Sequence, residues 1–143
     1  MATLYETDFH AWAYRQADLL RAGRLEEIDT ANMIEEIESM GRSEQRELVN
    51  RLVILLLHLL KWRFQPALRG NSWRLSIKEQ RLRLAGHLED NPSLKSKLDQ
   101  AIERAYHLAR LEAERETGLA ESTFDSRCPF SFAQMMDEGF WPD

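Results

Sequence analysis

Apolar residues fill the chain from Leu52 to Leu60, where His58 is the single polar residue among leucines, one isoleucine and one valine. The run lacks the polar–apolar alternation of a surface strand, and Pro66 lies shortly beyond it, where a helix cannot continue. We therefore predict a helix over about residues 43–64. Because a helix that is apolar nearly all round must be surrounded by others, the pattern predicts an all-α helical bundle with this helix buried at its centre.

Helical periodicity and end signals predict further helices on both sides of the central one. Gly23 and Gly41 each follow an amphipathic stretch, as glycines that end helices do. Asn91 followed by Pro92 is typical of a helix start, because proline is tolerated at the first helical position. The result is a bundle of five to six helices, over about residues 8–22, 29–40, 43–64, 71–90 and 91–117, with a short one near the C-terminus. A chain of 143 residues suits one core, so we expect residues 1–143 to form a single domain.

The C-terminal tail carries four aromatic residues after Pro129, which is too apolar for a disordered segment. Ser131 and Gln134 have the spacing of a capping box, in which the two side chains satisfy the free backbone N–H groups of a helix start. We expect a short helix there and a tail docked onto the bundle.

Helical wheels indicate which polar residues face inward. On the helix over 29–40, Met33, Ile34, Ile37 and Met40 share one face, which we expect to pack on the bundle, with Glu36 at its edge. On the later helices, polar or aromatic side chains occur on or beside the inner faces. We predict that they form one pocket between the second, third and fourth helices, lined by Glu36, His58, Lys61, Trp62, Trp73, Gln80 and Arg81. The same residues fit a buried polar network with a structural role only, and the sequence leaves both interpretations open.

One of these positions, His58, suggests a catalytic alternative together with Arg51. Helical ribonucleases of the HEPN superfamily carry an arginine and a later histidine on one helix with four to six residues between them, and Arg51 and His58, with six residues between them, fit that spacing. In such a metal-independent reaction His58 would be the general acid and base, and Arg51 would stabilise a pentavalent phosphate. The spacing is loose, and the net charge of −5 disfavours a nucleic-acid substrate.

Other features narrow the cofactors and partners. None of the four histidines has a glutamate three residues before it, and there is one cysteine, Cys128, so we expect no metal site and no cofactor. The N-terminus lacks a signal peptide's apolar segment, and the run from Leu52 to Leu60 is too short to cross a membrane. We therefore expect a cytoplasmic protein. Leu75 and Leu82 lie on the outer side of their helix, which indicates a protein partner or self-association rather than nucleic acid or membrane.

Several short motifs, taken together in this order, resemble a known family. They include Ile34-Glu-Glu-Ile37, His58-Leu-Leu-Lys61-Trp62, Gln65-Pro66, Asn91-Pro92-Ser93-Leu94 and Cys128-Pro129. The chain resembles the uncharacterised bacterial proteins catalogued as domain of unknown function 29. The resemblance implies an all-helical fold and carries no activity with it. We expect a helical protein-interaction domain without enzymatic activity, with the ribonuclease and the small-ligand pocket as alternatives.

Overall fold

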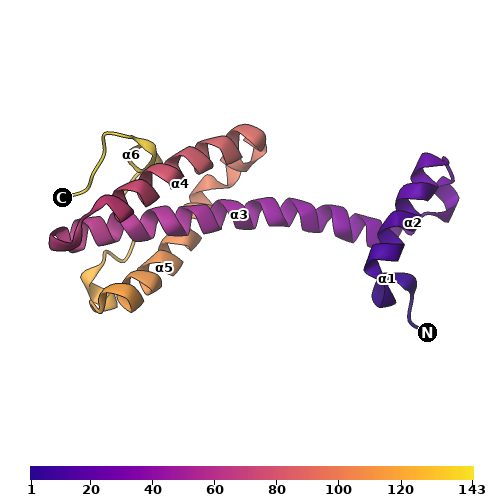
Figure 1. The fold of residues 1–143 in the computed structure, drawn as a ribbon, viewed down its shortest axis with the longest axis horizontal. Coiled ribbons are helices and arrows are strands. Elements are labelled where there is room, and N and C mark those ends of the chain that lie inside the picture. Colours follow the sequence, from indigo (N-terminus) through magenta and orange to yellow (C-terminus); the bar gives the residue numbers. More distant parts are fainter. The chain divides into compact units, whose positions relative to one another are not determined.

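The fold is entirely helical, as the sequence predicts. The computed structural model describes residues 1–143, which form six α-helices and four short 3-10 helices without a strand (Figure 1). The chain divides into two compact units, residues 1–42 and 43–143, and helix α3 (Thr30–Phe64) contributes to both. A single domain over 1–143 stays a prediction.

The first unit begins with two short helices. Helix α1 (Leu4–Thr7) starts at a capping box made by Thr3 and Glu6, and α2 (Phe9–Arg21) starts where the Asp8 side chain accepts a hydrogen bond from the backbone N–H of Ala11. Gly23 has a φ of 69°, a left-handed conformation that suits glycine, and a 3-10 helix, η1 (Leu25–Glu27), follows.

Asp29 fastens α2 to the start of α3. Its carboxylate accepts hydrogen bonds from Trp12 Nε1 at 2.9 Å and from Asn32 Nδ2 at 2.9 Å, and its backbone N–H donates to Gln16 Oε1 at 2.8 Å. The bonds from Asn32 and then Trp12 lower the pKa of Asp29 below its usual value. Trp12 and Gln16, which make two of these bonds, are both buried.

Helix α3 runs through Gly41, where the sequence predicted a break. Gly41 lacks the positive φ of a helix-ending glycine. A helical glycine costs only about 0.5–1 kcal/mol relative to alanine, and no proline is present to force an end. The predicted inner face of residues 29–40 is therefore wrong, because this segment continues into α3 instead of packing as a separate helix. Ile34, Ile37 and Met40 are 51%, 58% and 62% exposed.

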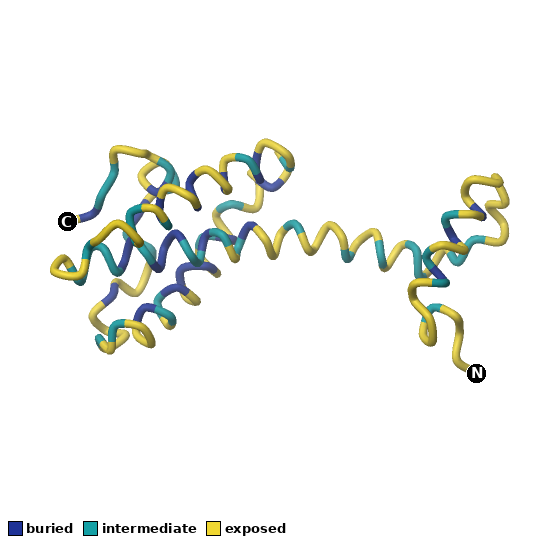
Figure 2. The backbone as a smooth tube through the Cα atoms, in the orientation of Figure 1, coloured by how far each residue is buried: buried dark blue, intermediate teal, exposed yellow.

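The second unit is built around the leucine run. Leu52, Leu55, Leu56, Leu59 and Leu60 are fully buried, which confirms the central helix (Figure 2). Figure 1 draws α4 (Asn71–Asp90) and α5 (Leu98–Thr117) on opposite sides of this part of α3. A short 3-10 helix, η2 (Pro66–Leu68), separates α3 from α4.

Helix α5 meets the core through small residues. It buries an alanine every four positions, one helical turn apart, so its backbone can approach the core leucines closely. These residues are Ala101, Ala105, Ala109 and Ala113.

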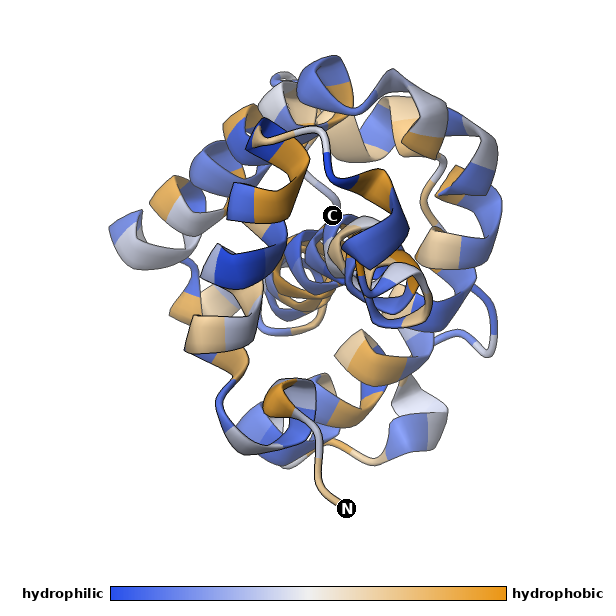
Figure 3. Cartoon of the chain, turned by 90° about the vertical axis from the view of Figure 1, so that its right-hand side faces the viewer, coloured by the Kyte–Doolittle hydropathy of each residue, from blue (hydrophilic) through white to orange (hydrophobic).

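Hydrophilic and hydrophobic residues alternate along the helices in Figure 3, as amphipathic packing requires.

The start of α5 differs from the prediction. After Asn91 the chain forms a 3-10 helix, η3 (Pro92–Lys97), before α5 begins at Leu98. The hydroxyl of Ser96 donates to the Ser93 carbonyl at 2.9 Å, and such side-chain bonds compete with α-helical pairing.

The C-terminal tail packs on the second unit, as predicted. A 3-10 turn, η4 (Glu121–Thr123), leads to α6 (Phe132–Met136), which starts at the expected capping box of Ser131 and Gln134. Phe124, Phe130 and Met135 are buried in the common core.

Candidate functional site

The structure separates one residue of the predicted pocket from the rest of that group. Glu36 lies in the first unit, where the Tyr5 hydroxyl donates to its carboxylate and the pKa of Tyr5 rises to about 12 because of that bond. The other residues belong to the second unit. Because α3 is continuous, the turn at Gly41 that was expected to fold Glu36 back against the next helix is absent.

Gln80 and Arg81 face inward, as the wheel predicts, and Arg81 holds the C-terminal tail. Its Nε donates to the Met135 carbonyl at 2.7 Å and its Nη2 to the Phe140 carbonyl at 2.8 Å. The guanidinium also lies 5.3 Å from the centre of the Trp141 ring. Burial lowers the pKa of Arg81. These contacts fit the structural interpretation of the polar residues.

Lys61, Trp62 and Trp73, which also belong to the predicted pocket, contact aromatic rings and a carboxylate. Lys61 Nζ lies 3.1 Å from Glu116 Oε2 and 4.8 Å from the centre of the Trp73 ring. Trp62 packs against Trp141 with ring centres 4.7 Å apart. Side chains that are already paired in this way have few polar atoms left to bind a ligand.

His58 is turned toward its own helix. Its Nδ1 lies 2.7 Å from the Ile54 carbonyl, and since a carbonyl only accepts, Nδ1 carries the proton. Burial lowers the pKa of His58 below its ordinary value. Arg51, the other residue of the ribonuclease hypothesis, contacts Glu47 with 3.5 Å between Nη2 and Oε1.

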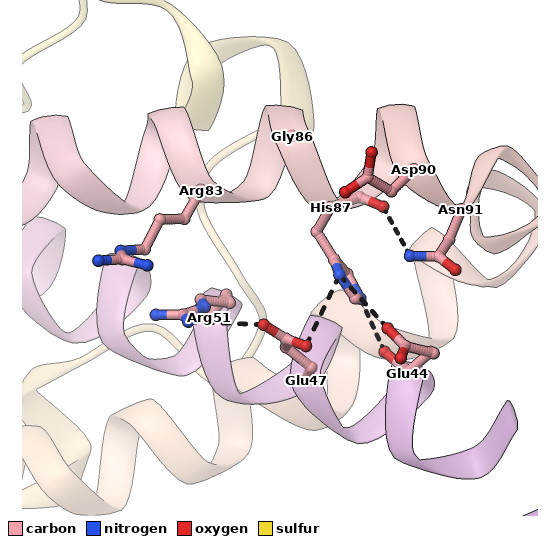
Figure 4. A pocket seen from close by; sticks show the side chains of 8 residues that line it. All are labelled: Glu44, Glu47, Arg51, Arg83, Gly86, His87, Asp90 and Asn91. Carbon is pink, nitrogen blue, oxygen red and sulfur yellow. Dashed lines mark hydrogen bonds and ion pairs between the residues drawn. The ribbon is translucent and has the colours of Figure 1, made fainter. Parts of the chain in front are cut away.

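Arg51 lies in a polar recess between α3 and α4, which we call the α3–α4 recess (Figure 4). His87 reaches into it from α4, and Glu44 and Glu47 lie opposite on α3. The recess is lined by Glu44, Glu47, Arg51, Arg83, Gly86, His87, Asp90 and Asn91.

His87 is the buried centre of this recess, with 8% of its surface exposed. Its Nε2 lies 2.9 Å from the Glu44 carbonyl, so Nε2 donates the hydrogen bond. Its Nδ1 lies 3.7 Å from Glu44 Oε2 and 3.8 Å from Glu47 Oε2. Two carboxylates and one imidazole nitrogen therefore converge from two helices.

Sequence reasoning missed this group of residues. The prediction of no metal site rested in part on the lack of a glutamate three residues before any histidine on one helix, whereas here Glu44 and Glu47 are three apart on α3 and the histidine comes from α4. The Glu-x-x-Glu spacing of Glu44 and Glu47 was the feature of the sequence that could have indicated this group. Its partner could not be assigned without knowing how the two helices pair.

A second candidate surface is apolar and lies on the N-terminal part of α3. Ile34, Ile37, Met40 and Gly41 fall within one third of the helix circumference, at 100° per residue. We call these four residues the α3 seam. The three large side chains are exposed, unlike the leucines later in the helix (Figure 2).

Comparison with protein families identifies the chain. The model of the family described as "Domain of unknown function DUF29" matches residues 4–141, almost the whole length. The chain belongs to the DUF29 family. This confirms the resemblance inferred from the motifs. For this DUF29 chain, comparisons with curated proteins and with solved structures find no significant match. None of its helices combines the length and hydrophobicity needed to cross a membrane.

Proposed function

We propose that this DUF29 chain is a helical interaction domain that pairs with a second copy of itself through the α3 seam. The observation that supports this most is the exposure of Ile34, Ile37 and Met40, each more than half accessible on one side of a helix. A contiguous apolar stripe rimmed by charges is typical of a protein contact surface. The proposal favours an interaction role over catalysis.

Gly41 supports close approach of another helix at the seam. A Cβ added at Gly41 meets nothing within 4 Å, and its φ is not positive, so no contact within the chain requires glycine there. An internal helical glycine lowers helix stability, and it usually has a packing or functional reason. A second helix lying across Gly41 would supply that reason.

The charges beside the seam favour a second copy in antiparallel orientation. Glu35 and Glu38 precede Arg42 along one flank, and Arg42 pairs with both of them within the chain, at 2.8 and 3.8 Å. All three side chains are about half exposed, so they are free to exchange partners. In an antiparallel two-fold pair the same flanks adjoin, so Arg42 of each copy meets the acidic residues of the other.

The proposal places this interaction in the cytoplasm. The chain has one cysteine, Cys128, which is free and partly buried. Burial raises the pKa of its thiol, which keeps it in the less reactive protonated form. A domain without disulfides suits a reducing compartment.

The test is sedimentation velocity over a concentration series with two matched variants. Ile37→Ser removes the central seam side chain, while Leu111→Ser removes an apolar side chain that is 51% exposed on α5. Because a buried isoleucine contributes about 1.5–3 kcal/mol, Ile37→Ser should weaken association about tenfold or more, and Leu111→Ser should leave it unchanged. A protein that stays monomeric at every concentration, or an equal loss in both variants, would refute the proposal.

A further inference from the structure

We propose that Glu44, Glu47 and His87 form a binding site for a divalent first-row transition-metal ion, with Zn²⁺ as the type case. This site lies in the α3–α4 recess and is independent of the α3 seam. The ligand atoms of the three residues all lie within 4.8 Å of one another. Three observations support it: the hydrogen bond that orients His87, the spacing of the ligand atoms and the groups around them.

The hydrogen bond of His87 leaves one nitrogen available to a metal. Since Nε2–H donates to the Glu44 carbonyl, the neutral ring has a lone pair on Nδ1, and Nδ1 takes part in no hydrogen bond. That lone pair belongs to a side chain more than nine-tenths buried and points toward the two carboxylates (Figure 4). A backbone carbonyl that fixes the tautomer and ring orientation of a histidine is the usual support of a metal-bound imidazole.

The spacing suits an ion better than direct contact. The distances of 3.7 and 3.8 Å from Nδ1 to the two carboxylate oxygens exceed the 2.7–3.2 Å of a hydrogen bond. Zn²⁺ binds nitrogen and oxygen at about 2.0–2.2 Å, so a tetrahedral site separates its ligand atoms by about 3.4 Å. The two distances from Nδ1 therefore differ from that separation by only a few tenths of an ångström.

Neighbouring groups orient the carboxylates and leave room for a further ligand. Arg51 Nη2 contacts Glu47 Oε1 at 3.5 Å, which directs the other oxygen, Oε2, toward His87. Asn91 Nδ2 donates to the His87 carbonyl at 3.1 Å and fixes the end of α4 beside the site. The side of the ion toward the recess is open, so water can complete the coordination.

The ligand set indicates the class of ion. Imidazole nitrogen favours zinc, iron, cobalt and nickel over magnesium and calcium, which prefer oxygen alone. Two carboxylates neutralise the charge of a divalent ion. One nitrogen and two oxygens, with an open position, therefore fit Zn²⁺ or Co²⁺ best.

The test is isothermal titration of the full-length protein with Zn²⁺, together with the absorption spectrum of Co²⁺. Glu47→Gln and His87→Gln each remove one ligand, and Glu89→Gln, an acidic position on α4 outside the recess, is the matched control. A Cys128→Ser background excludes thiolate binding. Circular dichroism establishes that each variant folds, and Glu47→Gln keeps the test valid if the buried His87 proves necessary for folding.

The expected result is one equivalent of Zn²⁺ bound, weakened at least about tenfold in each ligand variant and unchanged in Glu89→Gln. The tenfold minimum is based on residues that only hydrogen-bond to a metal ligand, since their loss alone weakens metal affinity by about 10–100-fold. Co²⁺ should give visible bands of a nitrogen and oxygen site. Absence of binding would mean that the three residues form an ion-paired group only and would overturn the proposal. Equal binding in Glu47→Gln and the control would overturn it as well.

Discussion

His58 shows how burial sets the state of a single side chain. Its neighbours include Lys61, which disfavours the charged ring, and Glu116, which favours it, but loss of hydration lowers the pKa most. The bond from Nδ1 to the Ile54 carbonyl opposes this only in part. The neutral ring is therefore the native form at pH 7.

This predicts a pH dependence of stability. The unfolded chain binds the His58 proton near pH 6.5, whereas the folded chain binds it only at lower pH. The contribution of His58 is thus present above about pH 6.5 and is lost as the pH falls toward the folded pKa. The free energy of unfolding should fall between pH 7.5 and 5.5, by less in His58→Gln. Urea denaturation at several pH values measures this, and identical profiles would contradict it.

Inward polar positions could be found from the sequence, but their partners could not. The helical wheel placed Gln80 and Arg81 on or beside the inner face, where both are buried. The carbonyls that Arg81 binds come from Met135 and Phe140, more than fifty residues later. A wheel describes one helix, and contacts at such separation depend on how the tail folds back.

At the scale of elements, proline was a more reliable predictor of a helix end than glycine. Pro66 ends α3 because its ring and missing N–H exclude it from a helix interior. Gly41 was expected to do the same and does not, because glycine only weakens a helix. Gly118, with a φ of 75°, does end α5. The sequence alone does not distinguish these two glycines, since the distinction lies in φ.

The central position of α3 predicts the effect of a charge in the leucine run. Leu56→Asp should unfold the second unit, because Leu56 is fully buried and an unpaired carboxylate there costs several kcal/mol out of a typical 5–15 kcal/mol. Leu82→Asp, at an exposed position, should fold normally. Circular dichroism during thermal unfolding compares the two. A folded Leu56→Asp protein with an unchanged melting temperature would contradict the assignment of a central helix.

The docked tail should contribute to stability as an element. Removing residues 129–143 exposes core surface and takes away the carbonyls that Arg81 binds, so the free energy of unfolding should fall by several kcal/mol, at about 1.5–3 kcal/mol per buried aromatic side chain. Removal of Asp143 alone, which is exposed, is the control. Chemical denaturation followed by tryptophan fluorescence measures the difference. Equal stability of the two truncated proteins would mean that the tail is a loose extension.

At the scale of the whole molecule, the two proposed sites depend on relations that a single sequence does not contain. The metal ligands Glu44 and His87 come together only because α3 and α4 pair in one register. The periodicity predicted an apolar face that includes Ile34, Ile37 and Met40 of the α3 seam, but as an inner face; its exposure follows from the continuity of α3 through Gly41. The helical class, the central helix and the docked tail were predictable because each depends on local pattern.

Gly41→Ala tests the proposed self-association most directly, because it should stabilise the fold and weaken the association of two copies. Alanine has open space at this position, so the free energy of unfolding of the dilute protein should rise by about 0.5–1 kcal/mol. In a closely packed helix pair the added methyl group overpacks the contact by about 1–3 kcal/mol, so the dissociation constant from sedimentation velocity should increase about tenfold or more. Higher stability with weaker association is the predicted result. Higher stability with unchanged or stronger association, or no association in the wild-type protein, would contradict the α3 seam as the contact between two copies.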